Sequence, residues 1–177
     1  NNLKQVALAC HNAESTYGYM PPAWGSYGPG IKGPVFFHLL PYIEQSSLYN
    51  SVLNASGQND CSFGGKYAGG GNPVCGTKVN AYVCPSDPTT GTKADANWAP
   101  GGNSNYAANW QVFAAGASSQ GKANLTSTFS DGTANTILFT ERIGVCSGVY
   151  QLWARWDSST DIYTPVFGGS AQTTGAT

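Results

Sequence analysis

The stretch NNLKQVALACHNAESTYG, residues 1–18, decides how this chain is organised. Its apolar side chains recur at steps of three and four residues, which places them on one face of an α-helix. Gly18 is the expected end of this helix, because glycine readily takes the left-handed conformation and Pro21-Pro22 prevents the helix from resuming. The residues of the apolar face are Leu3, Val6, Ala7, Cys10, Ala13 and Tyr17. Because the helical period runs up to the first residue, we expect residues 1–18 to continue a longer helix.

The rest of the chain is rich in small polar residues and poor in charge. Of its 177 residues, 41% are apolar and 10% are charged, whereas an average soluble domain has about 25% charged residues. One domain with a packed core is the default at this length. The net charge of −1 provides no electrostatic footprint for nucleic acid. Since low charge with many Ser, Thr and Asn residues is typical of exported proteins, we expect an extracellular or cell-surface protein that binds no nucleic acid.

Beyond residue 18, Gly- and Pro-rich segments alternate with short apolar runs. We predict a surface loop over 19–32, an apolar run over 35–40, a helix from 41 to about 54 and a long irregular segment over 54–77. Short strands are expected over 79–84, 105–113, 136–142, 149–156 and 162–167. This order predicts an α+β fold in which the N-terminal helix packs on a small antiparallel sheet with large Gly-rich loops. The helix takes residues 1–18, a single globular head takes 19–167, and a loose tail takes 168–177.

The five cysteines indicate disulfides rather than a zinc site. None of them pairs at C-x-x-C spacing and the chain has only two histidines, which argues against structural zinc. Export favours disulfide formation. The candidate pairs are Cys61 with Cys75, which closes the Gly-rich segment 62–74, and Cys84 with Cys146. Cys10 is then left as a small buried apolar group, and the alternative that all five are reduced stays open.

The sequence contains no recognisable catalytic motif. Its nine Asp and Glu residues form no spaced pair of the kind that serves general acid–base catalysis, and no glycine run is followed by the Lys-Ser/Thr of a phosphate loop. His11 and His38 lie outside G-x-S-x-G and H-E-x-x-H contexts. We interpret His38 as a packed residue and His11 as a packed or capping one, and we expect a protein that is not an enzyme.

A set of short motifs spans most of residues 1–145. They are Asn1-Asn2-Leu3-Lys4-Gln5, His11-Asn12, Tyr17-Gly18 with Pro21-Pro22, Leu40-Pro41-Tyr42-Ile43-Glu44-Gln45 with Leu48-Tyr49-Asn50, Cys84-Pro85-Ser86-Asp87, Ser104-Asn105-Tyr106, and Ser130-Asp131-Gly132-Thr133-Ala134-Asn135-Thr136-Ile137 with Glu141-Arg142. In this order they resemble a pseudopilin-like family of unknown function that is expanded in planctomycete bacteria. The resemblance implies a precursor with a cleavable, methylatable leader and an apolar helix, similar to type II secretion pseudopilins and type IV pilins.

This resemblance implies a structural role in a filament. A helix with one side covered by its own head can bundle with copies of itself, and such heterologous packing is open-ended. The assembly helix is then carried by Leu3, Val6, Ala7, Cys10 and Tyr17. The expected partners are copies of this chain or other pilin-like subunits. Contact with a membrane is expected only through an apolar helix upstream of residue 1, which anchors the subunit at the inner membrane, facing the periplasm, before assembly.

Calcium is the only cofactor that the resemblance implies. Major pseudopilins often hold calcium in a loop of Asp, Ser and carbonyl oxygens, and calcium prefers six to eight oxygen ligands. The candidate ligands are Ser86, Asp87 and Asp95, with Asp157 and Asp161 in a second loop. The alternative is that these aspartates only form turns.

A second class of function is a cell-surface module that binds a solute or glycan on exposed aromatic rings. The chain is 12% aromatic, although most such rings belong to cores. The candidate rings are Trp98, Tyr106, Trp110, Trp153 and Trp156. Rings that share one solvent-facing groove would favour this alternative, and rings buried between helix and sheet would favour a scaffold.

Overall fold

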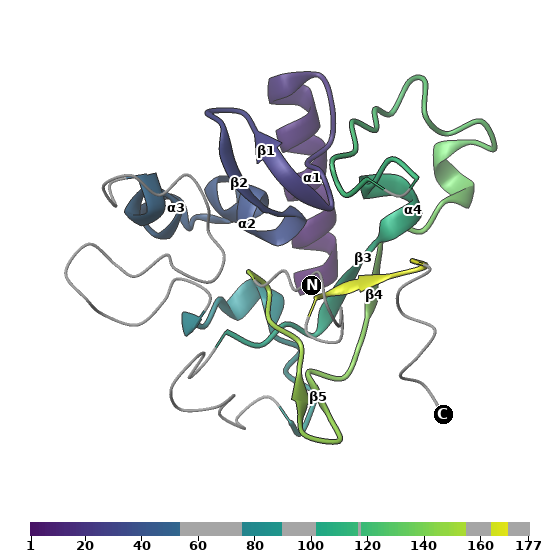
Figure 1. Ribbon diagram of the computed structural model, residues 1–177. Coiled ribbons are helices and arrows are strands. Elements are labelled where there is room, and N and C mark those ends of the chain that lie inside the picture. The colour runs from purple at the N-terminus through teal and green to yellow at the C-terminus, as the bar shows by residue number, and fades with distance from the viewer. Residues whose placement is uncertain (54–75, 90–101, 117, 155–163, 170–177) are drawn as a thin grey trace.

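The computed structural model describes residues 1–53, 76–89, 102–116, 118–154 and 164–169, and its elements are short apart from the first helix (Figure 1). The helices are α1 Asn2–Tyr17, α2 Val35–Leu39, α3 Ser46–Leu53 and α4 Trp110–Phe113, with 3-10 turns η1 Leu40–Ile43, η3 Asn80–Tyr82 and η4 Thr133–Asn135. The strands are β1 Trp24–Tyr27, β2 Ile31–Pro34, β3 Tyr106–Asn109, β4 Phe139–Glu141, β5 Val145–Cys146, β6 Val149–Tyr150 and β7 Val166–Phe167. The fold is α+β, as predicted.

Helix α1 ends where the sequence predicts. Gly18 takes the left-handed conformation with φ of 77°, and its N–H donates to the carbonyl of Glu14. Val6, Cys10 and Ala13, all on the predicted apolar face, are completely buried. The helix contacts α2, η1, η3 and strand β4. Helical turns therefore cover much of its buried face, and the sheet reaches it through β4.

The prediction of a surface loop over residues 19–32 is wrong. Strands β1 and β2 form an antiparallel hairpin there, and residues 20–23 are buried. Pro21 and Pro22 have no N–H group that burial could leave unpaired, while the N–H of the preceding Met20 donates to the carbonyl of Ala123 at 2.6 Å. A Gly- and Pro-rich composition here marks a buried connection, because the prolines remove donors that a buried loop would otherwise have to satisfy.

The main sheet has three strands in the order β4-β3-β7. Strand β3 is antiparallel to β4 but parallel to β7, so the sheet is mixed rather than wholly antiparallel as predicted. The strand predicted over 136–142 is present as the shorter β4. The described part of the strand predicted over 162–167, residues 164–167, contains β7, and that of the strand predicted over 149–156, residues 149–154, contains β6 and an isolated bridge between Asn103 and Leu152.

Two strand predictions fail because side chains redirect the backbone. The strand predicted over 105–113 stops at Asn109, whose side chain accepts a hydrogen bond from the N–H of Gln111 and caps α4. The strand predicted over 79–84 is the turn η3. Its Tyr82 is completely buried and donates its hydroxyl to the carbonyl of Phe36 at 2.5 Å. A buried phenol that must find an acceptor holds this segment in a turn.

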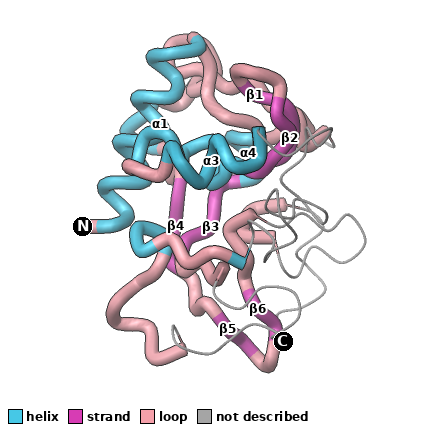
Figure 2. The backbone as a smooth tube through the Cα atoms, turned by 90° about the vertical axis from the view of Figure 1, so that its left-hand side faces the viewer, coloured by secondary structure: helices cyan, strands magenta, loops and turns pink. Residues whose placement is uncertain are grey.

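One main hydrophobic core joins α1, the β1–β2 hairpin, α2, η1, α3 and strands β3 and β4. Figures 1 and 2 show the β1–β2 hairpin at one end of the molecule and the β5–β6 hairpin at the other, with the N-terminal end of α1 at the outer edge in Figure 2. No helix in the described part of the chain is long and apolar enough to cross a membrane.

His38 lies inside this core, as predicted, and is 2% exposed. Its Nε2 lies 3.0 Å from the carbonyl oxygens of both Gly25 and Gly33, which only accept, so Nε2 carries the hydrogen. Within the described residues, Nδ1 is buried without a hydrogen-bond partner. Burial lowers the pKa of His38 from 6.5 to about 4, although the two carbonyl contacts oppose that shift.

We expect the stability of the protein to fall as the pH drops below 6.5. Between pH 6.5 and about 4, the unfolded chain binds a proton at His38 that the folded protein excludes, so the slope is about 1.4 kcal/mol per pH unit. Urea unfolding at pH 7, 6.5, 6, 5.5 and 5 should therefore show a loss of about 2 kcal/mol below pH 6.5. The His38→Gln variant should lose this slope, and an unchanged slope in that variant would assign the effect to other groups.

Candidate functional site

Helix α1 has one buried and one open face. Val6, Ala9, Cys10 and Ala13 are at most 1% exposed and pack into the core. The opposite side, which we call the open face, consists of Lys4, Leu8, His11 and Ser15, all exposed. These four are related by steps of three and four residues, so they form a continuous stripe along the helix. The helix thus joins the head by one side and presents the other to solvent.

Leu8 is the residue of this helix that sequence periodicity missed. It is 58% exposed and lies opposite the predicted apolar face. Of the residues predicted for the assembly helix, Val6 and Cys10 are buried, Leu3 and Ala7 are partly buried, and Tyr17 is exposed. Leu8 could have been found as the one large apolar side chain that falls off the stripe. His11 is exposed rather than packed, because it also belongs to the open face.

Three motifs that are far apart in the sequence meet at Asn105. This side chain is completely buried, and its Oδ1 accepts a hydrogen bond from the N–H of Cys84 at 2.8 Å. Its Nδ2 donates to the Oδ2 of Asp87, and its main-chain carbonyl accepts from the N–H of Arg142 at 2.7 Å. Cys84–Asp87, Ser104–Tyr106 and Glu141–Arg142 therefore form one structural unit, which we call the motif junction.

Asp87 links the motif junction to the β5–β6 hairpin. Its Oδ1 accepts hydrogen bonds from the N–H and the hydroxyl of Thr89, and its Oδ2 accepts one from the N–H of Gly144 at 2.8 Å, next to the bond from Asn105. Burial alone would raise the pKa of the Asp87 carboxyl, but these hydrogen bonds outweigh it and hold the pKa below its ordinary value. The ionised carboxylate is thus the acceptor that joins three loops.

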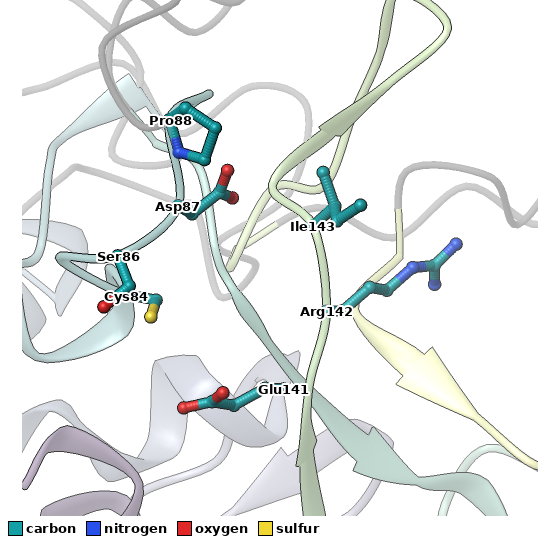
Figure 3. A pocket seen from close by; sticks show the side chains of 7 residues that line it. All are labelled: Cys84, Ser86, Asp87, Pro88, Glu141, Arg142 and Ile143. Carbon is teal, nitrogen blue, oxygen red and sulfur yellow. The ribbon is translucent and has the colours of Figure 1, made fainter.

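A pocket of about 350 Å³ lies beside the motif junction (Figure 3). We call it the base pocket, and its lining residues are Cys84, Ser86, Asp87, Pro88, Glu141, Arg142 and Ile143. Ile143 is 57% exposed. The side chain of Arg142 extends away from that of Glu141 in Figure 3, and its Nη1 lies 3.5 Å from the carbonyl of Val166. Glu141 is exposed and is an acidic group that lines the pocket.

The base pocket lies next to the N-terminal end of α1. The side chain of Asn2 donates to the carbonyl of Val83 at 2.8 Å and to that of Asn80 at 3.2 Å, and Val83 directly precedes the pocket residue Cys84. Burial, and after it the Cys84 and Glu141 side chains, raise the pKa of the Tyr106 phenol, although a hydrogen bond with the side chain of Asn2 opposes that shift. The start of α1 and the base pocket are therefore held in a fixed relation.

The residues predicted to bind calcium fall only partly within the described residues. Ser86 is exposed and Asp87 is partly buried, whereas Asp95, Asp157 and Asp161 lie outside the described residues. Across the ranges that the structure describes, no three His, Cys, Asp or Glu side chains are close enough together to hold a metal ion. The hydrogen bonds to Asp87 give its carboxylate a structural role.

The cysteines predicted to form disulfides also lie only partly within the described residues. Cys84 and Cys146 are free thiols, so the predicted pair between them is not present in the structure. The hydrogen bond that Asn105 accepts from the N–H of Cys84 holds that residue at the junction, whereas Cys146 belongs to the β5–β6 hairpin. Cys10 is also free and buried, and desolvation raises the pKa of its thiol to about 12. Cys61 and Cys75 lie outside the described residues.

The aromatic rings proposed for solute stacking do not form an exposed platform among the described residues. Trp153 is completely buried and Tyr106 is 3% exposed, because both belong to the core of the head. Trp110 is partly exposed and donates its indole N–H to the carbonyl of Gly116 at 3.3 Å. Trp98 and Trp156 lie outside the described residues. The rings whose placement is known therefore serve packing.

Comparison with known proteins identifies one family. Residues 1–161 match a family described as "Protein of unknown function (DUF1559)". No curated protein and no solved structure matches the chain. The match extends over α1, the motif junction and the base pocket.

Proposed function

The chain belongs to the DUF1559 family of proteins of unknown function, and we propose that it is a non-enzymatic structural subunit of an extracellular filament. The filament is of the kind built by type IV pilins and type II secretion pseudopilins. Its partners are copies of the same chain or other pilin-like subunits, and its place is the cell surface after assembly from the inner membrane.

The two faces of α1 carry this proposal. A helix that served only a monomer core would turn its large apolar residues inward, whereas Leu8 is 58% exposed. Each copy thus has one helix side fixed to its head and one side free to contact a neighbour. Contacts between unlike surfaces are open-ended and build filaments.

The chemistry of the motif junction supports a structural rather than a catalytic role. Asp87 accepts hydrogen bonds from Thr89, Asn105 and Gly144, which leaves its carboxylate committed to holding loops together. His38 is enclosed in the core and contacts two main-chain carbonyls. Both groups are therefore engaged in structure, where a general base or acid needs access to a substrate.

Imaging of the native assembly tests the proposal. Material sheared from the surface of the producing cells should contain thin filaments that react with antibodies raised against residues 19–167, and a cryo-electron-microscopy reconstruction should place α1 along the filament axis. Shed material from cells lacking the gene should contain no such filaments and serves as the control. Recovery of the protein only as a free monomer or in an unrelated complex would contradict the proposal.

A further inference from the structure

We propose that the base pocket of one subunit receives Lys4 and Leu8 from the open face of α1 of a second copy. This inference rests on the proposed filament and names the contact that holds neighbouring subunits together. The occupant is a second copy because this chain itself presents both an apolar and basic ridge and an acidic pocket with an apolar rim.

The ridge is formed by two side chains one helical turn apart. Leu8 is 58% exposed and Lys4 is also exposed. Their spacing of four residues places them side by side on the helix surface. The ridge therefore offers an apolar group and an ammonium group about one turn of helix apart.

The base pocket offers the complementary groups. Pro88 and Ile143 provide apolar surface, and Ile143 is itself 57% exposed. Glu141 provides the negative charge, because the carboxylate of Asp87 is already bonded to four donors and Arg142 extends away from Glu141 (Figure 3). Opposite charges at such a contact fix its register and disfavour other partners.

The placement of ridge and pocket permits this contact between parallel copies. The pocket lies at the start of α1, which is fixed there by the bonds from Asn2 to Asn80 and Val83. Leu8 lies six residues further along the helix, about 9 Å at the α-helical rise. Two copies with parallel α1 helices, offset by about this distance, place Leu8 of one beside the pocket of the other. The two surfaces differ, so the contact repeats without closing.

Cysteine cross-linking tests the contact, because the pocket contains the free thiol of Cys84. In a Leu8→Cys variant, filaments oxidised with diamide should give a ladder of covalent multimers on a non-reducing gel. The ladder should disappear in the Leu8→Cys, Cys84→Ser double variant. The matched control is Ser15→Cys, on the same open face two turns further along, which should give no ladder that depends on Cys84.

Charge exchange provides a second measurement. Lys4→Glu and Glu141→Lys should each reduce the yield of sheared filaments by about tenfold or more, since each places like charges together. The Lys4→Glu, Glu141→Lys double variant should restore most of that yield. Normal filaments from Leu8→Cys without a ladder that depends on Cys84, or a double variant no better than the singles, would overturn the contact and leave the filament intact. If even the wild-type protein forms no filaments, the proposed function itself fails.

Discussion

A Leu8→Glu variant is expected to fold like the wild-type protein and to be lost from surface filaments. Leu8 is 58% exposed in the subunit, and Glu is about as good a helix former as Leu, so stability should change by less than about 0.5 kcal/mol. At a subunit contact the same change removes an apolar anchor worth roughly 1.5–3 kcal/mol and brings a charge into a desolvated site. The result is a loss of filament mass of about a hundredfold or more.

Two measurements check this prediction together. Thermal unfolding of the purified protein should give the same midpoint as the wild type, and the amount of the variant in sheared filaments should fall. Ile137→Glu is the matched control, because Ile137 is 65% exposed and belongs to neither α1 nor the base pocket. If both variants enter filaments normally, the open face of α1 is not an assembly surface. If both are lost equally, the effect reflects added surface charge rather than Leu8.

The sequence predicts those parts of the fold that depend on local signals. The end of α1 at Gly18 follows from a conformation that glycine adopts at no steric cost, and the burial of Val6 and Cys10 follows from helical periodicity. Helical periodicity does not predict the exposure of Leu8, because the same rule assigns apolar residues to the buried face. The functional proposal depends on an apolar residue that lies off that face, and periodicity alone does not single such a residue out.

Local sequence patterns do not predict elements that depend on contacts with residues far away in the chain. The side chain of Gln120 accepts a hydrogen bond from the N–H of Ser26 at 2.8 Å and donates to its carbonyl at 3.1 Å. Gln120 thus pairs with the β1 backbone as a neighbouring strand would, 94 residues away in sequence. The parallel pairing of β7 with β3 likewise has no signature within either strand. Composition near residues 19–32 therefore suggested a loop where a long-range contact stabilises a hairpin.

The candidate site shows the same division. The sequence shows three separate motifs, Cys84–Asp87, Ser104–Tyr106 and Glu141–Arg142. Nothing in their spacing along the chain predicts that they contact one another. Asn105 joins them because a buried amide must satisfy both its oxygen and its nitrogen. The separate motifs thus belong to one hydrogen-bonded junction, which forms only when the chain folds.

Loss of the Asp87 carboxylate should be the most damaging single change at this junction. An Asp87→Ala variant is expected to lose about 3–5 kcal/mol of unfolding free energy, since buried donors lose a charged acceptor at once. Two of those donors are Asn105 and the N–H of Gly144, both in buried residues. Asp87→Asn should lose less, because it keeps one oxygen, but its amide group then faces another donor. Urea unfolding at pH 7 measures both variants.

A control variant and the pH dependence of the unfolding free energy test the role of the Asp87 carboxylate further. Asp131→Asn changes an exposed turn aspartate and should alter stability by less than about 0.5 kcal/mol. Because the folded-state pKa of Asp87 is lowered, its contribution is present at neutral pH and is lost as the pH falls through that value. As the pH falls, protection of the backbone amides from hydrogen exchange should decrease at Gly144 and at Val145, whose N–H donates to the Thr89 hydroxyl. This decrease should precede any loss of protection in the core. An Asp87→Ala variant as stable as Asp131→Asn would show that the junction contributes nothing to holding the β5–β6 hairpin against the head.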